Sequence, residues 1–203
     1  MKRIILMMLV LALLLAGCGS TGDGEIQKGD VTSEAIAEDQ NQSGQDASDS
    51  EATSEEPYVL QFSGVTLDGE TLTSECFANS KLTMINVWAT FCGPCINEMP
   101  DLGEIAKEYD SSDFQLIGII SDVIEGEEGD TFTEAEEIVK ETGADYKHLL
   151  LNEELYMNLV GASDSVPTTY FFNSKGEYLG YLVGAQSKEV WKQIIDSLLA
   201  ENN

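Results

Sequence analysis

The stretch that most constrains the fold of this chain is residues 84–100, MINVWATFCGPCINEMP. It opens as an apolar, β-branched run suited to a buried strand, breaks at Cys92-Gly93-Pro94-Cys95, and continues as a helix-forming segment. A thiol at a helix N-terminus meets unpaired backbone N–H groups and the positive end of the helix dipole. Both favour the thiolate and lower the cysteine pKa. The stretch therefore predicts a nucleophilic Cys92, with Cys95 one helical turn on and able to close a reversible disulfide.

Two cysteines at this spacing can also form half of a zinc site. Such a site needs two more ligands at comparable spacing. The remaining candidates are Cys18, Cys76 and His148, and their positions do not suit one. We therefore favour redox chemistry and expect neither a metal nor another cofactor.

The residues around the cysteine pair resemble a known signature. Trp88-Ala89-Thr90-Phe91-Cys92-Gly93-Pro94-Cys95 is similar to the active-site motif of the thioredoxin superfamily, and Asn97-Glu98-Met99-Pro100 resembles its membrane-tethered TlpA/ResA branch. The resemblance implies a thioredoxin-like α/β fold over residues 58–203. In that fold a mixed sheet is flanked by helices on both faces, with an N-terminal β-hairpin and a strand-helix insertion.

The pattern of residues 58–203 agrees with that layout, because helices alternate with strands before a closing hairpin and helix. A hairpin is predicted from 59–62 and 65–67, with a helical turn at 73–77. The predicted strands are 81–90, 114–120, 146–151, 168–172 and 177–183. The predicted helices are 92–109 with Pro100 kinking it, 131–143 capped at Thr131 or Thr133, 153–159, and 187–199 capped at Ser187. Residues 122–130 read as an acidic loop.

The resemblance also assigns roles. Cys92, at the exposed helix tip, would attack a substrate disulfide, and the more buried Cys95 would resolve the mixed disulfide. The family places a cis-proline just before a strand, facing the dithiol, and Val166-Pro167 stands in that context. The alternative is a trans proline opening an edge strand. With a cis bond, the backbone of Val166 could pair with an extended substrate.

Proton handling is where the chain departs from thioredoxin. Asn86 occupies the strand position at which thioredoxin has a buried acid, and an amide cannot titrate. Glu98, one turn past Cys95, is a candidate for that role, although a solvated helix face is the interpretation we favour for it. An acid between residues 122 and 164 is a further alternative.

Four other residues receive weaker assignments. We expect Trp88 to be core, and Phe91 to keep an aromatic rim beside Cys92 without a tryptophan N–H. Cys76 reads as an inert buried thiol or, less favoured, a third redox cysteine. His148, the single histidine, reads as structural.

The start of the chain is predicted to target and anchor the protein. Residues 1–17 have a basic start and a short apolar run, as in a signal peptide. Leu15-Ala16-Gly17-Cys18 resembles a bacterial lipobox, which implies lipidation of Cys18 and anchoring to a membrane. An ordinary signal peptide is the alternative. Residues 18–57 read as a lipidated cysteine and a disordered acidic tether with a reach of roughly 35 Å.

The formal net charge of −27 favours solubility and argues against nucleic acid as a partner. By resemblance, the chain is an extracytoplasmic thiol–disulfide oxidoreductase on the outer face of a membrane. Its expected clients are disulfide-bearing envelope proteins, such as apocytochrome c or methionine sulfoxide reductase. A membrane electron donor of the CcdA/DsbD type would recharge it, and we expect a monomer. The alternatives are a peroxiredoxin-related thiol peroxidase and a non-enzymatic copper chaperone.

Overall fold

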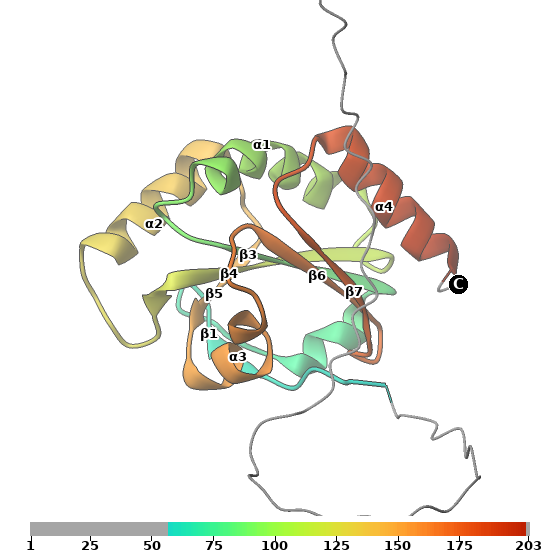
Figure 1. The fold of residues 1–203 in the computed structure, drawn as a ribbon, viewed down its shortest axis with the longest axis horizontal. Helices are drawn as coiled ribbons and strands as arrows, with labels where there is room; N and C mark the ends of the chain where they lie inside the picture. The colour runs from blue at the N-terminus through green and yellow to red at the C-terminus, as the bar shows by residue number, and fades with distance from the viewer. Residues whose placement is uncertain (1–56, 202–203) are drawn as a thin grey trace, which may run out of the picture.

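The structure, a computed structural model, describes residues 57–201. At its centre lies a five-stranded sheet in the order β5-β4-β3-β6-β7 (Figure 1). The strands are β3 Leu82–Trp88, β4 Phe114–Ile124, β5 Lys147–Leu151, β6 Thr168–Asn173 and β7 Tyr178–Val183. β3 runs parallel to β4, and β4 to β5, whereas β6 is antiparallel to both β3 and β7. Every residue of β3 is buried, because this apolar strand has a neighbour on each side and a layer on each face.

Helices cover both faces of the sheet, as predicted. α1 Gly93–Glu108, α2 Asp130–Thr142 and α4 Lys188–Glu201 lie on one face (Figure 1). The other face carries α3 Glu153–Asn158, the 3₁₀ helices η1 Ser74–Asn79 and η2 Val160–Ala162, and a hairpin of β1 Ser63–Val65 with β2 Thr71–Thr73. This is the expected mixed sheet flanked by helices. Within residues 57–201 no helix is both long enough and apolar enough to cross a bilayer.

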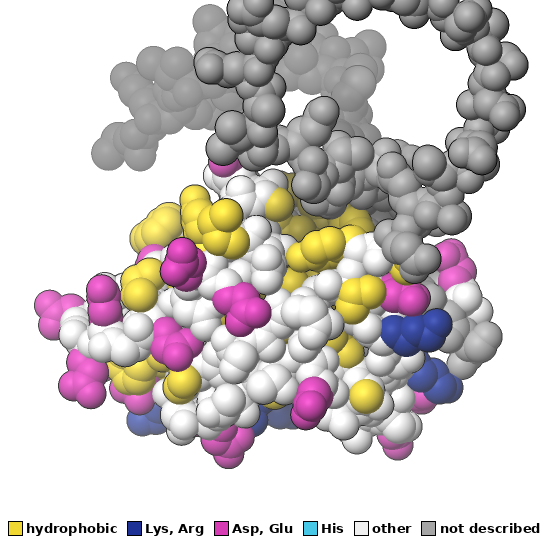
Figure 2. All heavy atoms as spheres, turned by 90° about the horizontal axis from the view of Figure 1, so that it is seen from below, with side chains coloured by type: hydrophobic (Ala, Val, Ile, Leu, Met, Phe, Trp, Pro, Cys, Tyr) yellow, Lys and Arg dark blue, Asp and Glu magenta, His cyan; other side chains and the backbone are white. Residues whose placement is uncertain are grey.

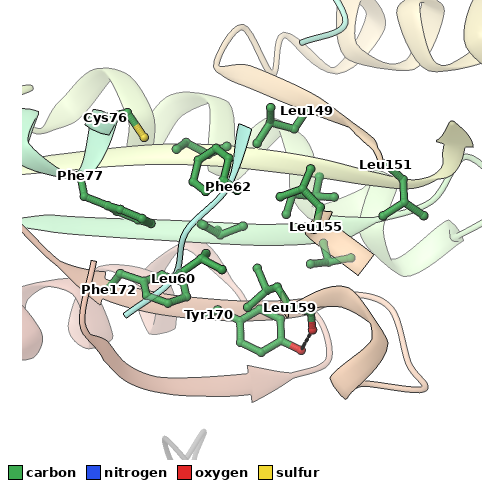
Figure 3. Close-up of a cluster of buried hydrophobic side chains, with 14 residues drawn as sticks. Leu60, Phe62, Cys76, Phe77, Leu149, Leu151, Leu155, Leu159, Tyr170 and Phe172 are labelled. Atoms are coloured by element: carbon green, nitrogen blue, oxygen red, sulfur yellow. Dashed lines mark hydrogen bonds between the residues drawn. The ribbon is translucent and has the colours of Figure 1, made fainter. Parts of the chain in front are cut away.

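The core on the hairpin face packs aromatic rings against the sheet (Figure 3). Phe77 stacks edge-on to Phe62 at 5.9 Å between centroids and lies 5.3 Å from Phe172. Tyr170 buries its ring here and donates its hydroxyl hydrogen to the Leu159 carbonyl at 3.3 Å. The sheet is thereby tied to the segment that precedes the cis-proline.

Three local predictions were wrong in detail. The hairpin turns at Thr66–Glu70 and pairs Ser63 with Thr73, because the Thr66 side chain bonds the Glu70 backbone and closes a turn around Asp68-Gly69. β4 continues to Ile124, so Asp122 belongs to a strand and the acidic loop begins at Glu125.

The third concerns the start of α2, where Gly129 occupies the N-cap and no side chain caps the helix. Neither Thr131 nor Thr133 has the predicted role, and the Thr133 hydroxyl bonds the Gly129 carbonyl instead. The predicted cap at Ser187 is confirmed, because its Oγ accepts the Val190 N–H at 3.4 Å.

The surface on the hairpin side carries acidic side chains scattered over it, with lysines at the margin (Figure 2). This distribution agrees with an acidic surface that favours solubility. The predicted signal peptide, the Cys18 lipidation site and the tether lie outside the described residues.

Candidate functional site: a disulfide at the start of a helix

The cysteine pair lies at the start of α1, shortly after the end of β3. Cys92 is the N-cap of α1, and its Sγ accepts the Cys95 N–H at 3.2 Å. Pro94 lies in the first turn, where a missing N–H costs the helix nothing. Cys92 and Cys95 form a disulfide, with 5.3 Å between their Cα atoms. The predicted pairing is therefore present, at a helix N-terminus suited to stabilising a thiolate after reduction.

The predicted exposure of Cys92 was wrong. Cys92 is 5% exposed and Cys95 is fully buried, whereas Phe91 is 78% exposed. The link before α1 turns back on itself, because the Cys92 N–H donates to the Ala89 carbonyl at 3.0 Å. The Phe91 ring therefore projects into solvent, and Cys92 is held against Cys95.

The second predicted element is confirmed in its geometry: the Val166–Pro167 bond is cis. β6 begins directly after it, and Val166 packs against the apolar cluster that contains both cysteines. The Pro167 carbonyl accepts the Gly184 N–H at 2.8 Å, which fixes the loop after β7 to the same site. The fold thus brings residues 92–95 and 166–167 together, although they lie far apart in the sequence.

A hollow of about 340 Å³ reaches Phe91, the residue before Cys92, on the α3 side of the sheet. Phe91 and Val166 both line it, as do Tyr156 and Val160 near α3 and Tyr170 of β6. Its lining contains both aromatic rings and hydroxyl groups. The arrangement gives room for an apolar side chain between Phe91 and Val166.

The preferred interpretation of Glu98 as a solvated residue was wrong. Glu98 is 3% exposed and faces inward from α1. Its Oε2 accepts the Trp191 Nε1–H at 3.2 Å and the Gln186 N–H at 3.1 Å, and its Oε1 accepts from the Asn86 side chain at 3.1 Å. Burial raises the pKa of Glu98 to about 7, although these hydrogen bonds act in the opposite direction. Glu98 is therefore an acid that can gain or lose a proton near neutral pH.

Asn86 stands between Glu98 and β6. Its Nδ2 donates to Glu98 Oε1 and to Thr169 Oγ1, both at 3.1 Å. Its Oδ1 has no hydrogen-bond partner among the described residues. Because an amide can turn to present either atom, Asn86 can donate to ionised Glu98 or accept from protonated Glu98. Asn86 cannot titrate itself, but it can therefore bond Glu98 in either of the protonation states of Glu98.

Sequence reasoning missed the partners Thr169, Gln186 and Trp191. Trp191 reads from the sequence as an ordinary apolar residue of the last helix, and no spacing links it to Glu98. A buried tryptophan N–H needs an acceptor, which is the one signal that could have suggested such a contact.

Trp88 is fully buried, and His148 is 3% exposed and structural in its contacts. The indole N–H of Trp88 donates to His148 Nδ1 at 3.1 Å, and His148 Nε2 pairs with the Ala144 carbonyl at 2.9 Å. Burial lowers the pKa of His148 to about 4, so the ring is neutral at physiological pH. Cys76 is buried and free, and burial raises its pKa to about 11, which agrees with an inert thiol.

A disulfide between two cysteines at a helix N-terminus, on a sheet of this topology, is the site of a thioredoxin-like thiol–disulfide oxidoreductase. The chain belongs to the Redoxin family, whose model matches residues 42–154.

Known relatives agree with this assignment. The chain is 30% identical to the thioredoxin-like protein YneN of Bacillus subtilis, over 66% of this chain and 75% of that protein. It is 23% identical to the thiol-disulfide oxidoreductase ResA of Geobacillus thermodenitrificans, over 58% of this chain and 63% of that protein. The chain is 27% identical to the thiol:disulfide interchange protein DsbE of Haemophilus influenzae, over 63% of this chain and 65% of that protein. The chain therefore spans just under two thirds of the ResA and DsbE relatives.

The fold agrees with a crystal structure of a thioredoxin-family thiol:disulfide interchange protein from Chlorobium tepidum. The two superpose with a TM-score of 0.62 at 26% identity, over 72% of this chain and 99% of the other. The chain is thus similar to exchange proteins in sequence and in architecture.

Proposed function

We propose that the protein reduces disulfides of envelope proteins through Cys92 and Cys95. The observation that carries the proposal is the Cys92–Cys95 disulfide at the N-terminus of α1, in a fold shared with exchange proteins. In the reduced form, the Cys92 thiolate attacks one sulfur of a substrate disulfide and releases the other substrate sulfur as a thiolate. Cys95 then attacks Cys92 Sγ, releases the second substrate thiolate and re-forms the disulfide. Two electrons pass to the substrate, and each released thiolate takes a proton.

We propose Glu98 as the group that accepts the Cys95 proton. Cys95 is fully buried, so water does not easily remove its proton, and Glu98 follows it by one turn on the same helix. A carboxyl with a pKa of about 7 is suited to accept a proton from a thiol and to return it near neutral pH. The orphan oxygen of Asn86 then gives the protonated carboxyl an acceptor.

The substrate would lie across the cis-proline side of the site. Val166 flanks the cysteine cluster, and its backbone is the proposed partner for an extended substrate segment. The hollow lined by Phe91 and Val166 would take an apolar side chain of that segment. The relatives named ResA and DsbE are a thiol-disulfide oxidoreductase and a thiol:disulfide interchange protein, which supports a disulfide-bearing client here. We propose that this client is an apocytochrome c or a methionine sulfoxide reductase.

The N-terminal sequence supports the location that we propose. A lipidated Cys18 would hold the domain at the extracytoplasmic face of a membrane, on the tether of residues 19–57. Reducing power would reach it from a membrane donor of the CcdA/DsbD type. The domain would work as a monomer.

The test is reduction of insulin by the chain without residues 1–57, with dithiothreitol as the electron source. We expect turnover by the native domain and none by Cys92→Ser, because that variant has no nucleophile. Cys76→Ser is the matched control and should retain the native rate, since Cys76 is buried away from the pair. Full activity in Cys92→Ser would refute the mechanism.

A further inference from the structure

We propose that Asp122, near the end of β4, is a positioning residue for the exchange reaction. It anchors Thr90 and so fixes residues 89–92, the link between β3 and α1 that carries Cys92. This inference rests on the proposed role of Cys92 as nucleophile. It assigns a function to a carboxylate that the reaction steps above do not use.

The contact between Asp122 and Thr90 is close. The Thr90 N–H donates to both carboxylate oxygens at 3.1 Å, and the Thr90 hydroxyl donates to Oδ2 at 2.6 Å. Thr90 is 6% exposed, so its two donors are largely shielded from water and depend on this carboxylate. Hydrogen bonds to an ionised acceptor are stronger than neutral ones. Asp122 therefore holds Thr90 firmly.

The rest of the link is held in a similar way. The neighbour of Asp122, Ser121, donates its hydroxyl hydrogen to the Trp88 carbonyl at 3.0 Å. The Cys92 N–H bonds the Ala89 carbonyl within the link itself. The last residues of β4 thus hold the link on both sides of Ala89, and they set where Cys92 meets α1.

Position matters here for two reasons. The favourable effect of a helix N-terminus on a thiolate fades within the first turn. Attack on a disulfide also requires aligned sulfur atoms, and a misplacement of about 1 Å can cost about a hundredfold in rate. If the link could shift, the helix N-terminus would stabilise the Cys92 thiolate less, and Cys92 Sγ would be less well aligned with the substrate disulfide.

The charge of Asp122 alone predicts the opposite effect. A carboxylate near Cys92 disfavours the thiolate, so removing it would lower the Cys92 pKa and speed the reaction. If anchoring dominates, removing it slows the reaction and raises that pKa. The two explanations therefore differ in sign, and one set of variants can separate them.

The experiment measures alkylation of Cys92 by iodoacetamide in the reduced full chain in detergent, as a function of pH, with the modified residue mapped by mass spectrometry. We expect Asp122→Ala to slow Cys92 alkylation at pH 7 by about tenfold and to move its inflection to higher pH. Thr90→Val loses only the hydroxyl contact and keeps the backbone N–H contacts, so it should act in the same direction with a smaller effect. Asp122→Asn and Thr90→Ser keep an acceptor and a donor, and should recover most of that loss. The double variant Asp122→Ala/Thr90→Val should be no slower than Asp122→Ala, because Asp122→Ala already removes the hydroxyl contact that Thr90→Val removes.

Asp110, which precedes β4, offers a matched control. Its Oδ1 accepts the Ser112 N–H at 2.8 Å and the Ser112 hydroxyl at 2.7 Å, which is the same chemistry far from Cys92. Asp110→Ala should leave Cys92 alkylation unchanged. Urea unfolding of each variant separates a lost anchor from a lost fold.

The inference is overturned if Asp122→Ala reacts as fast as the native chain or faster, or if the losses in the double variant add. If Asp122→Ala does not fold, equal rates for Thr90→Val and Thr90→Ser overturn it instead. If Cys95 is alkylated before Cys92 in the native chain, the proposed nucleophile is wrong and the inference falls with it. Unchanged rates in all variants, with Cys92 reacting first, refute the role of Asp122 alone.

Discussion

Replacing Glu98 by glutamine should change how the stability of the protein depends on pH. Glu98 is buried, and its pKa lies at about 7 instead of 4.5. Below about pH 4.5 the carboxyl is protonated in both the folded and the unfolded chain. Between pH 4.5 and 7 the unfolded chain loses this proton while the folded chain keeps it, so the free energy of unfolding falls as the pH rises. Above pH 7 the penalty is constant. Glutamine does not titrate and removes this term.

The size of the effect follows from the pKa. Each pH unit between the unfolded pKa of 4.5 and the folded pKa of about 7 is worth about 1.4 kcal/mol. Raising the pH through this whole interval therefore lowers the free energy of unfolding by about 3 kcal/mol. Glutamine also places an NH₂ group near the donors of Trp191, Gln186 and Asn86, which adds a cost that does not vary with pH. The informative quantity is therefore the pH dependence of the difference between variant and native protein.

The assay is urea unfolding of both oxidised proteins from pH 4 to 8. We expect the stability of Glu98→Gln relative to native to rise by about 3 kcal/mol across this range, with most of the change between pH 4.5 and 7. Glu134→Gln, an exposed glutamate of α2, is the control and should follow the native curve. Parallel curves for Glu98→Gln and native protein would show that Glu98 titrates normally, and the proposed proton acceptor would then lose its basis.

Three further outcomes are expected. In the reduced native protein Cys92 should be alkylated before Cys95, with an inflection below the ordinary cysteine pKa of roughly 8.5; prior reaction of Cys95 would reverse the two roles. Cys18→Ala should release the protein from membranes on fractionation, and a native protein that is soluble with an unmodified Cys18 by mass spectrometry would contradict the anchor. Gly118→Ala should lower the free energy of unfolding in urea by about 3 kcal/mol, because its Cβ would lie 2.2 Å from His148 Nδ1. Gly129→Ala meets no atom within 4 Å and serves as its control; equal stability of the two variants would refute the packing argument.

Much of the fold could be predicted because its signals are local. The apolar run before Cys92 predicts a buried strand, and the glycine at 143 correctly marks the end of α2, where it takes φ +67°. The cysteine spacing allows a disulfide because the two residues share one helical turn, and the lack of two further ligands at comparable spacing favours it over a zinc site. The ends of strands have weaker local signals. β4 extends through Asp122 to Ile124, beyond the apolar stretch 114–120, because its backbone continues to pair with β5.

The chemistry of the site was decided by tertiary structure. Glu98 looks like a surface residue in the sequence, and only the packing of α4 against α1 encloses it with Trp191, which lies 93 positions away. The same holds for the contact of Asp122 with Thr90, 32 positions apart, and for the low exposure of Cys92. Covalent neighbours determine helix, strand and the spacing of the two sulfurs. The burial that raises a carboxyl pKa depends on which distant segments the topology brings against it.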